Sequence, residues 1–236
     1  MTKSASILIV EDEAAIRVGL VDVLIYHGYQ VDYAKEGLSG LEKALTGKYD
    51  LILLDVMLPN MDGFKICTKI REQDKDQPII MLTAKSDDED IINGFTLGAD
   101  DYVSKPFSVT QLILRIKAVL RRSIPETTEV TFIQLDKSRI VDLQNLCIQI
   151  GKDKLLFTKR EIEVLEFLQR NNQRPVAREE LLSCVWGYSE ELAIETRTVD
   201  IHIARIRRKI EKDPKTPQFL ITVRGAGYRL ICGNGN

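Results

Sequence analysis

The chain has 236 residues, 44% of them hydrophobic and 29% charged, with a formal net charge of -2 at pH 7, which is typical of a globular protein with one large or two ordinary domains. No apolar run approaches the roughly 18 residues that a membrane-spanning helix requires, and the amino terminus lacks the pattern of a signal peptide, so we expect a cytoplasmic protein that makes no use of a membrane. The four cysteines and two histidines are too scattered in the sequence to indicate a zinc site, a redox dithiol or a Cys/His catalytic pair.

Residues 1–122 alternate between short apolar runs and amphipathic segments. The apolar runs predict strands at residues 7–10, 31–34, 50–55, 79–83 and 102–103. Between and after them, apolar residues at helical spacing predict helices through residues 14–26, 38–45, 64–70, 91–97 and 112–120. Because parallel neighbours need right-handed helical crossovers, this alternation predicts an α/β fold, a five-stranded doubly wound parallel sheet with strand order 2-1-3-4-5.

Three carboxylates follow the first and third predicted strands. Glu11 and Asp12 come after the first strand, and Asp55 ends the third. In the order 2-1-3-4-5 these strands are neighbours at the switch point of the sheet, so we expect the three carboxylates to meet in one crevice. Their mutual repulsion calls for a cation, and ligands that are all oxygen favour Mg²⁺, with a backbone carbonyl near Met57 completing the set.

Two more polar residues end strands at the same edge of the sheet, Thr83 after the fourth and Lys105 after the fifth. Taken singly, Asp55 could merely begin a loop, Thr83 could be an ordinary strand end and Lys105 a surface lysine. Beside a metal, however, Lys105 could neutralise the equatorial oxygens of a phosphoryl group, and the Thr83 hydroxyl could donate to one of them. The set predicts a phosphoryl-transfer site with an exposed Asp55 as the nucleophile.

Hydrophobic periodicity lapses at residues 123–133, which we interpret as a linker. Beyond it we expect short strands at residues 140–150 and 155–157, and then a helix that Thr158 begins in a capping box with Glu161. A second helix runs through Trp186 and a third through residues 199–210, and residues 219–223 and 228–231 predict a β-hairpin.

The third helix and the hairpin concentrate positive charge. Residues 1–122 hold 15 basic and 19 acidic residues, the remainder holds 18 and 16, and residues 197–229 alone hold nine and three. A charge-rich helix can simply be a solvated face. Three helices followed by a hairpin that carries Arg224 and Arg229, however, predict a winged helix-turn-helix whose third helix enters the major groove of DNA.

Several of these motifs resemble those of a known family. The motifs Glu11-Asp12, Asp55, Thr83-Ala84 and Lys105-Pro106-Phe107 resemble those of the receiver domain of bacterial response regulators. The motif Gly-Ala-Asp-Asp-Tyr at residues 98–102 resembles that of one group of these proteins, the OmpR/PhoB family. The effector domain of that family has motifs similar to residues 158–161, 185–187, 197–200, 205–209 and 222–229. The resemblance covers residues 6–122 and 140–231.

The resemblance implies a phosphorylation-activated transcriptional regulator of a two-component system, with a receiver at residues 1–122 and a winged-helix DNA-binding domain at residues 134–236. It also implies Mg²⁺, a sensor histidine kinase that phosphorylates Asp55, and a cis Lys105-Pro106 peptide. On phosphorylation Thr83 would move toward the phosphoryl group while Tyr102 rotates inward. Further implied partners are duplex DNA with tandem half-sites, RNA polymerase and, after phosphorylation, a second copy of the chain.

The same resemblance assigns two sets of contact residues. Implied phosphate or base contacts are Arg197, Thr198, His202, Arg205, Arg207 and Arg224, whereas Ala204 stands where some relatives have a basic contact residue. The implied dimer interface includes Ile91, Asp100, Asp101, Gln111, Arg115 and Arg122. Ile91 and Gln111 stand where relatives have an ion pair across the dimer interface. We therefore expect the dimer contact at this point to be more apolar and less sensitive to salt than in relatives.

Two other classes of function fit parts of the sequence. A phosphatase with an aspartate nucleophile would use a similar sheet, but such enzymes usually carry a second aspartate two residues later, where this chain has Met57. A protein-binding adaptor with a receiver would not need the basic helix and hairpin. We therefore expect no enzymatic activity beyond Mg²⁺-dependent self-phosphorylation and dephosphorylation.

Overall fold

A computed structural model of the chain describes residues 4–84, 98–120, 131–188 and 197–233. Contacts between residues divide the chain into two compact units, residues 1–122 and 123–236, and each is described by itself. Within the described residues, every helix is too short or too polar to cross a membrane.

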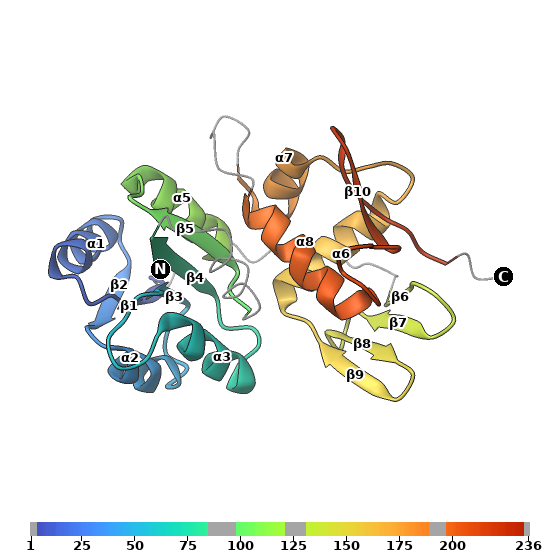
Figure 1. The fold of residues 1–236 in the computed structure, drawn as a ribbon. Helices are drawn as coiled ribbons and strands as arrows, with labels where there is room; N and C mark the ends of the chain where they lie inside the picture. Colours follow the sequence, from blue (N-terminus) through green and yellow to red (C-terminus); the bar gives the residue numbers. More distant parts are fainter. Residues whose placement is uncertain (1–3, 85–97, 121–130, 189–196, 234–236) are drawn as a thin grey trace. The chain divides into compact units, whose positions relative to one another are not determined.

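The first unit is a parallel sheet with helices on both faces (Figure 1). Its strands are β1 (Ser6–Val10), β2 (Gln30–Ala34), β3 (Leu51–Asp55), β4 (Ile79–Ala84) and β5 (Asp101–Lys105). The described helices are α1 (Ala14–Tyr26), α2 (Gly37–Ala44), α3 (Gly63–Gln73) and α5 (Val109–Leu120). The order β2-β1-β3-β4-β5 confirms the predicted sheet, and the helix predicted through residues 91–97 lies outside the described residues.

β3 lies at the centre of this sheet because its side chains are apolar on both faces. Leu51 to Leu54 are fully buried, and the strand pairs with β1 on one side and β4 on the other. Leu51 and Leu53 pack into a core with side chains of α1 and α5, while alternate residues face the opposite layer. Since full burial of a leucine contributes about 1.5–3 kcal/mol, the run fixes β3 in the middle of the sheet and brings Asp55 to its carboxyl edge.

The second unit combines a four-stranded antiparallel sheet, helical segments and a hairpin. The sheet, in the order β6-β7-β8-β9, consists of β6 (Phe132–Gln134), β7 (Arg139–Asp142), β8 (Cys147–Ile150) and β9 (Asp153–Leu156). The helical segments are α6 (Lys159–Arg170), α7 (Arg178–Leu181), the π-helical turn η2 (Leu182–Trp186) and α8 (Arg197–Ile210), and the hairpin is β10 (Leu220–Val223) with β11 (Gly227–Leu230).

Two predictions about strands in this unit were wrong in detail. β6 begins at Phe132, inside the segment that we interpreted as a linker. The strand predicted over residues 140–150 is two strands, because the chain reverses between β7 and β8. Asp142 stabilises this reversal by accepting hydrogen bonds from the backbone N–H groups of Gln144 and Asn145, as aspartates commonly do in turns.

Glu161 joins the start of α6 to α8. The predicted capping box is confirmed, since Glu161 accepts from the Thr158 N–H and the Thr158 hydroxyl accepts from the Glu161 N–H. The fully buried carboxylate also lies 2.5 Å from Lys209 Nζ and 3.7 Å from Arg205 Nε. Burial alone would raise the pKa of Glu161, but the charges of Lys209 and Arg205 lower it. Glu161 therefore stays ionised and provides the counter-charge of two cations on α8.

The substitution Glu161→Gln tests this role because it keeps the size of the side chain and removes its charge. We expect the free energy of unfolding of the second unit to fall by about 3 kcal/mol, the usual cost of leaving a buried charge without its partner. Urea unfolding of the full chain would measure it.

Glu166→Gln is the matched control on the same helix. It removes the partner of Arg170, 2.8 Å away in a more exposed pair, and should cost no more than about 0.5 kcal/mol. Equal losses from the two variants would contradict a special role for Glu161.

Candidate functional sites

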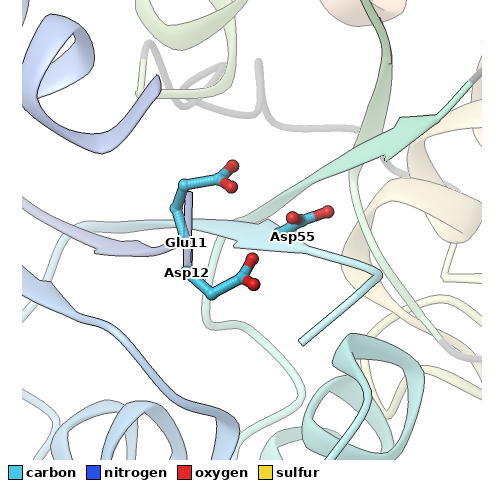
Figure 2. A group of neighbouring side chains, drawn as sticks. All are labelled: Glu11, Asp12 and Asp55. Atoms are coloured by element: carbon cyan, nitrogen blue, oxygen red, sulfur yellow. The ribbon is translucent and has the colours of Figure 1, made fainter. Parts of the chain in front are cut away.

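Glu11, Asp12 and Asp55 meet at one edge of the first sheet, as the strand order predicted. Val10 lies opposite Leu54 in the pairing of β1 with β3, so the residues that follow them are close together. Ligand oxygens of the three carboxylates all lie within 4.8 Å of one another (Figure 2). Asp12 is exposed, whereas Glu11 is fully buried and Asp55 is only 3% exposed. The expectation of an exposed Asp55 was wrong, because the residue is still part of the paired strand and Lys105 lies against it.

Lys105 bridges the two buried carboxylates. Its Nζ donates to Glu11 Oε2 and to Asp55 Oδ2, at 2.8 Å in each case. Burial alone would lower the pKa of Lys105, but the hydrogen bonds to Asp55 and Glu11 raise it, so the amine is protonated. Burial is also the largest effect on Glu11 and raises its pKa to about 7. The Lys105–Pro106 peptide is cis, as the resemblance implied.

The donor set of the crevice fits a hard divalent cation. Glu11 and Asp55 each give one oxygen to Lys105, and the other oxygen accepts a backbone N–H, from Glu13 at 3.3 Å and from Met57 at 3.2 Å. Carboxylate oxygens keep further lone pairs for a metal, and Asp12 adds a third carboxylate at the exposed side. Oxygen-only ligands that can retain water suit Mg²⁺.

Arg17 shapes the acidic loop, although our sequence analysis did not single it out. This buried side chain donates from Nη1 to the backbone carbonyls of Glu11, at 2.9 Å, and Asp12, at 2.8 Å. Its guanidinium also lies 5.6 Å from the ring centroid of Tyr33. A signal was present in the sequence, because a cation near the start of a helix is unfavourable for the helix dipole and needs other partners.

Thr83 and Tyr102 lie on β4 and β5, as predicted. Asp55 is opposite Leu82 in the sheet, so Thr83 is the next residue along β4 at the same edge. Tyr102 pairs with Met81, one strand further out. Thr83 is partly buried and Tyr102 is buried. Their coupled movement on phosphorylation stays a prediction.

The predicted DNA contacts of the second unit divide by exposure. Arg197 and Arg224 are exposed and Arg207 is partly buried, whereas Thr198, His202 and Arg205 are buried. The His202 ring makes an edge-to-face contact with Trp186, with 5.1 Å between centroids, and Arg205 faces Glu161. A DNA contact from His202 or Arg205 would require the side chain to leave these partners, so the exposed arginines are the stronger candidates.

The aspartates of the predicted dimer interface have partners within the chain. Asp101 accepts two hydrogen bonds from Arg115 Nη1, at 2.9 and 2.8 Å. Asp100 accepts from Arg71 Nη2 at 3.0 Å and from the Ile79 N–H at 2.8 Å. Gln111 is partly buried on α5, and Ile91 and Arg122 lie outside the described residues. Pairing of these groups across subunits stays a prediction.

Comparisons with known proteins agree with both halves of this description. A family model described as a response regulator receiver domain matches residues 7–117, and one described as a transcriptional regulatory protein, C terminal, matches residues 152–230. The response regulator ArlR of Staphylococcus haemolyticus is 43% identical over 224 residues, which cover 94% of this chain and 98% of the relative. PhoP of Bacillus subtilis, an alkaline phosphatase synthesis transcriptional regulatory protein, is 42% identical over 231 residues, 95% of each chain.

The fold is also similar to solved structures. The structure of a RitR mutant is 28% identical and matches with a TM-score of 0.69, covering 98% of this chain and 100% of the other.

Gly63 permits α3 to begin directly against the site. Its N–H donates to Val56 O at 2.9 Å, and a Cβ at this position would lie 2.0 Å from the carbonyl oxygen of Asp55. A residue with a side chain would therefore have to push α3 away from the end of β3.

We predict that Gly63→Ala lowers the free energy of unfolding of the first unit by about 2 kcal/mol, the usual range for overpacking. Gly19→Ala in α1 is the control, because no atom lies within 4 Å of its added Cβ, and it should stabilise the helix by roughly 0.5–1 kcal/mol. Urea unfolding of both variants would measure the difference. A Gly63→Ala variant as stable as the wild type would show that the close approach is unimportant.

Proposed function

Because the chain belongs to the OmpR/PhoB family of response regulators, we propose that Asp55 accepts the phosphoryl group and that Arg197 and Arg224 lead the contacts with DNA. Membership of this family makes the protein a phosphorylation-dependent DNA-binding transcriptional regulator and not a catalytic enzyme. The observation that carries the proposal for Asp55 is the position of Lys105, 2.8 Å from its carboxylate.

The chemistry at Asp55 is transfer of a phosphoryl group to a carboxylate oxygen. One oxygen of Asp55 attacks the phosphorus of the donor, the bond to the leaving group breaks with its electron pair, and an acyl phosphate forms. Lys105 neutralises charge on the equatorial oxygens, and Thr83 donates a hydrogen bond to one of them. Glu11, Asp12, Asp55 and the carbonyl near Met57 would hold Mg²⁺, which supplies further charge neutralisation when bound.

We predict that Asp55→Asn abolishes labelling by acetyl phosphate, because an amide is not a nucleophile toward phosphorus. Labelling of the wild type should require Mg²⁺ and disappear with excess chelator. Intact mass measured after incubation with the donor would detect one added phosphoryl group.

Asp76→Asn, at an exposed position of the same unit, should label like the wild type. Stable labelling of Asp55→Asn, or full labelling of the wild type in chelator, would contradict the site.

DNA binding in this proposal combines α8 with the turn of the hairpin. Arg197 begins α8 and Arg224 lies in the turn between β10 and β11, and both side chains are exposed. A helix in the major groove and a wing on the adjacent backbone place cations of this kind near phosphates. Since phosphate contacts release counterions, the affinity should fall steeply with salt.

We predict that Arg224→Ala weakens binding to duplex DNA by about 1–2 kcal/mol and reduces the salt slope by about 1. Fluorescence anisotropy at several salt concentrations would measure both quantities. Lys152→Ala is a charge-matched control at the exposed turn between β8 and β9 and should change neither. An Arg224→Ala variant with the affinity and slope of the wild type would exclude the wing contact.

We also propose the remaining partners that the resemblance implied. In the cytoplasm a sensor histidine kinase would supply the phosphoryl group to this chain, and the phosphorylated chain would dimerise through the face that includes α5, with Asp100, Asp101 and Arg115. A dimer suits tandem half-sites on the DNA, from which the chain could contact RNA polymerase.

A further inference from the structure

The hairpin β10–β11 forms a two-stranded sheet of its own. An isolated two-stranded hairpin is at best marginally stable. The orientation of this hairpin, which is the wing of the winged helix-turn-helix, therefore depends on its contacts with the rest of the unit. The turn residue Arg224 is exposed. Its position relative to α8 therefore depends on how firmly the hairpin is held against the helices. The contacts between the hairpin and the helices therefore matter for DNA binding.

Tyr228 is the residue of the hairpin that contacts both α7 and α8. It is buried, and its backbone N–H and carbonyl pair with those of Val176, at 2.9 and 2.7 Å, in an isolated β-bridge just before α7. Its hydroxyl donates to Asp200 Oδ1 on α8 at 2.5 Å and accepts from Arg178 Nη2 on α7 at 2.9 Å. Arg178 Nε also donates to Asp200 at 2.7 Å, which closes a triangle of the three side chains.

The backbone next to Tyr228 lies very close to Val176. Gly227 has φ +112°, a backbone conformation that residues with a side chain rarely adopt, and a Cβ there would lie 2.0 Å from Val176 O. The glycine thus permits the close approach that brings the Tyr228 hydroxyl to α8.

A second anchor lies on the other strand of the hairpin. Arg207 of α8 donates from Nε to Leu220 O at 2.7 Å and from Nη2 to Thr222 Oγ1 at 2.8 Å. Thr222 is directly opposite Tyr228 in the hairpin. Asp200 and Arg207 are seven residues apart, so they lie on one face of α8 about 10 Å from each other along its axis. Two such points hold both strands and prevent the wing from rotating about either contact.

These contacts give Asp200, Arg207 and Tyr228 a role other than that of DNA contacts. Two of the guanidinium nitrogens of Arg207 are committed to β10, although the resemblance implied that this residue contacts DNA. The Tyr228 ring is buried, and its hydroxyl donates to the Asp200 carboxylate, whose side chain is 44% exposed. A tyrosine needed only for the hydrophobic core would not require this hydrogen bond.

We propose that Tyr228, Asp200, Arg178 and Arg207 form a clamp that sets the position of the wing relative to α8, so that Arg224 reaches DNA while α8 is bound. The four are positioning residues for DNA recognition. The inference rests on the proposed function in one respect, the contact of Arg224 with DNA.

Tyr228→Phe tests the clamp because it removes one hydroxyl and leaves the ring. The probe is a duplex selected from a random-sequence library by the wild-type chain, and anisotropy gives the affinity of four full-length proteins: wild type, Tyr228→Phe, Arg224→Ala and the double variant. We expect Tyr228→Phe to weaken binding roughly three- to tenfold, the range for a lost hydrogen bond. In the Arg224→Ala background it should weaken binding less than about twofold, because a displaced wing has no contact left to lose.

Tyr49→Phe is the matched control, since the Tyr49 hydroxyl donates to Asp32 Oδ2 at 2.7 Å in the first unit. It should leave the affinity within about twofold in both backgrounds. If Tyr228→Phe fails to fold by circular dichroism, Asp200→Asn takes its place in the same cycle.

Equal losses in the two backgrounds, or no loss in a folded Tyr228→Phe protein, would overturn the clamp while leaving the Arg224 contact intact. An Arg224→Ala protein with full affinity would instead remove the wing contact, and the clamp with it. The salt slope provides a second measure, because Tyr228→Phe should reduce it as Arg224→Ala does, whereas a loss of stability alone would leave it unchanged.

Discussion

The hydrogen bonds from Lys105 to Glu11 and Asp55 hold together the edge of the first sheet at which we propose phosphorylation. They join the ends of β1, β3 and β5, residues that are 94 and 50 positions apart in sequence. Two ionised carboxylates this close would repel each other strongly in a medium of low polarity, and the Lys105 ammonium group between them offsets this repulsion. The apolar strands beneath supply the burial that strengthens these bonds. In the proposed mechanism the same amine meets the phosphoryl group on Asp55.

The second unit uses buried or half-buried carboxylates in a comparable way. Glu161 pairs with both Arg205 and Lys209 between α6 and α8, and Asp200 connects α8 to Arg178 and Tyr228. Glu161 lies on α6 and faces cations of α8, whereas Asp200 belongs to α8 and pairs with Arg178 of α7. This arrangement lets α8 carry a large positive charge without losing its packing against the rest of the unit.

Sequence patterns predicted the sheet and the acidic crevice because both follow from one rule, that parallel strands of apolar residues present their carboxyl ends together. They could not predict that Asp55 would be covered, since this depends on the reach of Lys105 from a distant strand. The position of Arg17 near a helix start indicated that it needs partners, but not which ones, because these are the backbone carbonyls of Glu11 and Asp12. On α8 the pattern of cations and apolar residues did not show which arginines are buried and which are exposed. Arg205 is buried and faces Glu161, whereas Arg197 is exposed. That distinction depends on where α6 packs.

The most direct test of the account is to locate the acyl phosphate in the wild-type chain. Borohydride reduces an aspartyl phosphate to homoserine, and mass spectrometry of the digested protein identifies the residue that changed. After incubation with acetyl phosphate and Mg²⁺, homoserine should appear at position 55 and be absent when the donor is omitted. Homoserine at position 12, or a phosphorylated protein in which residue 55 is still aspartate, would contradict the assignment of the site.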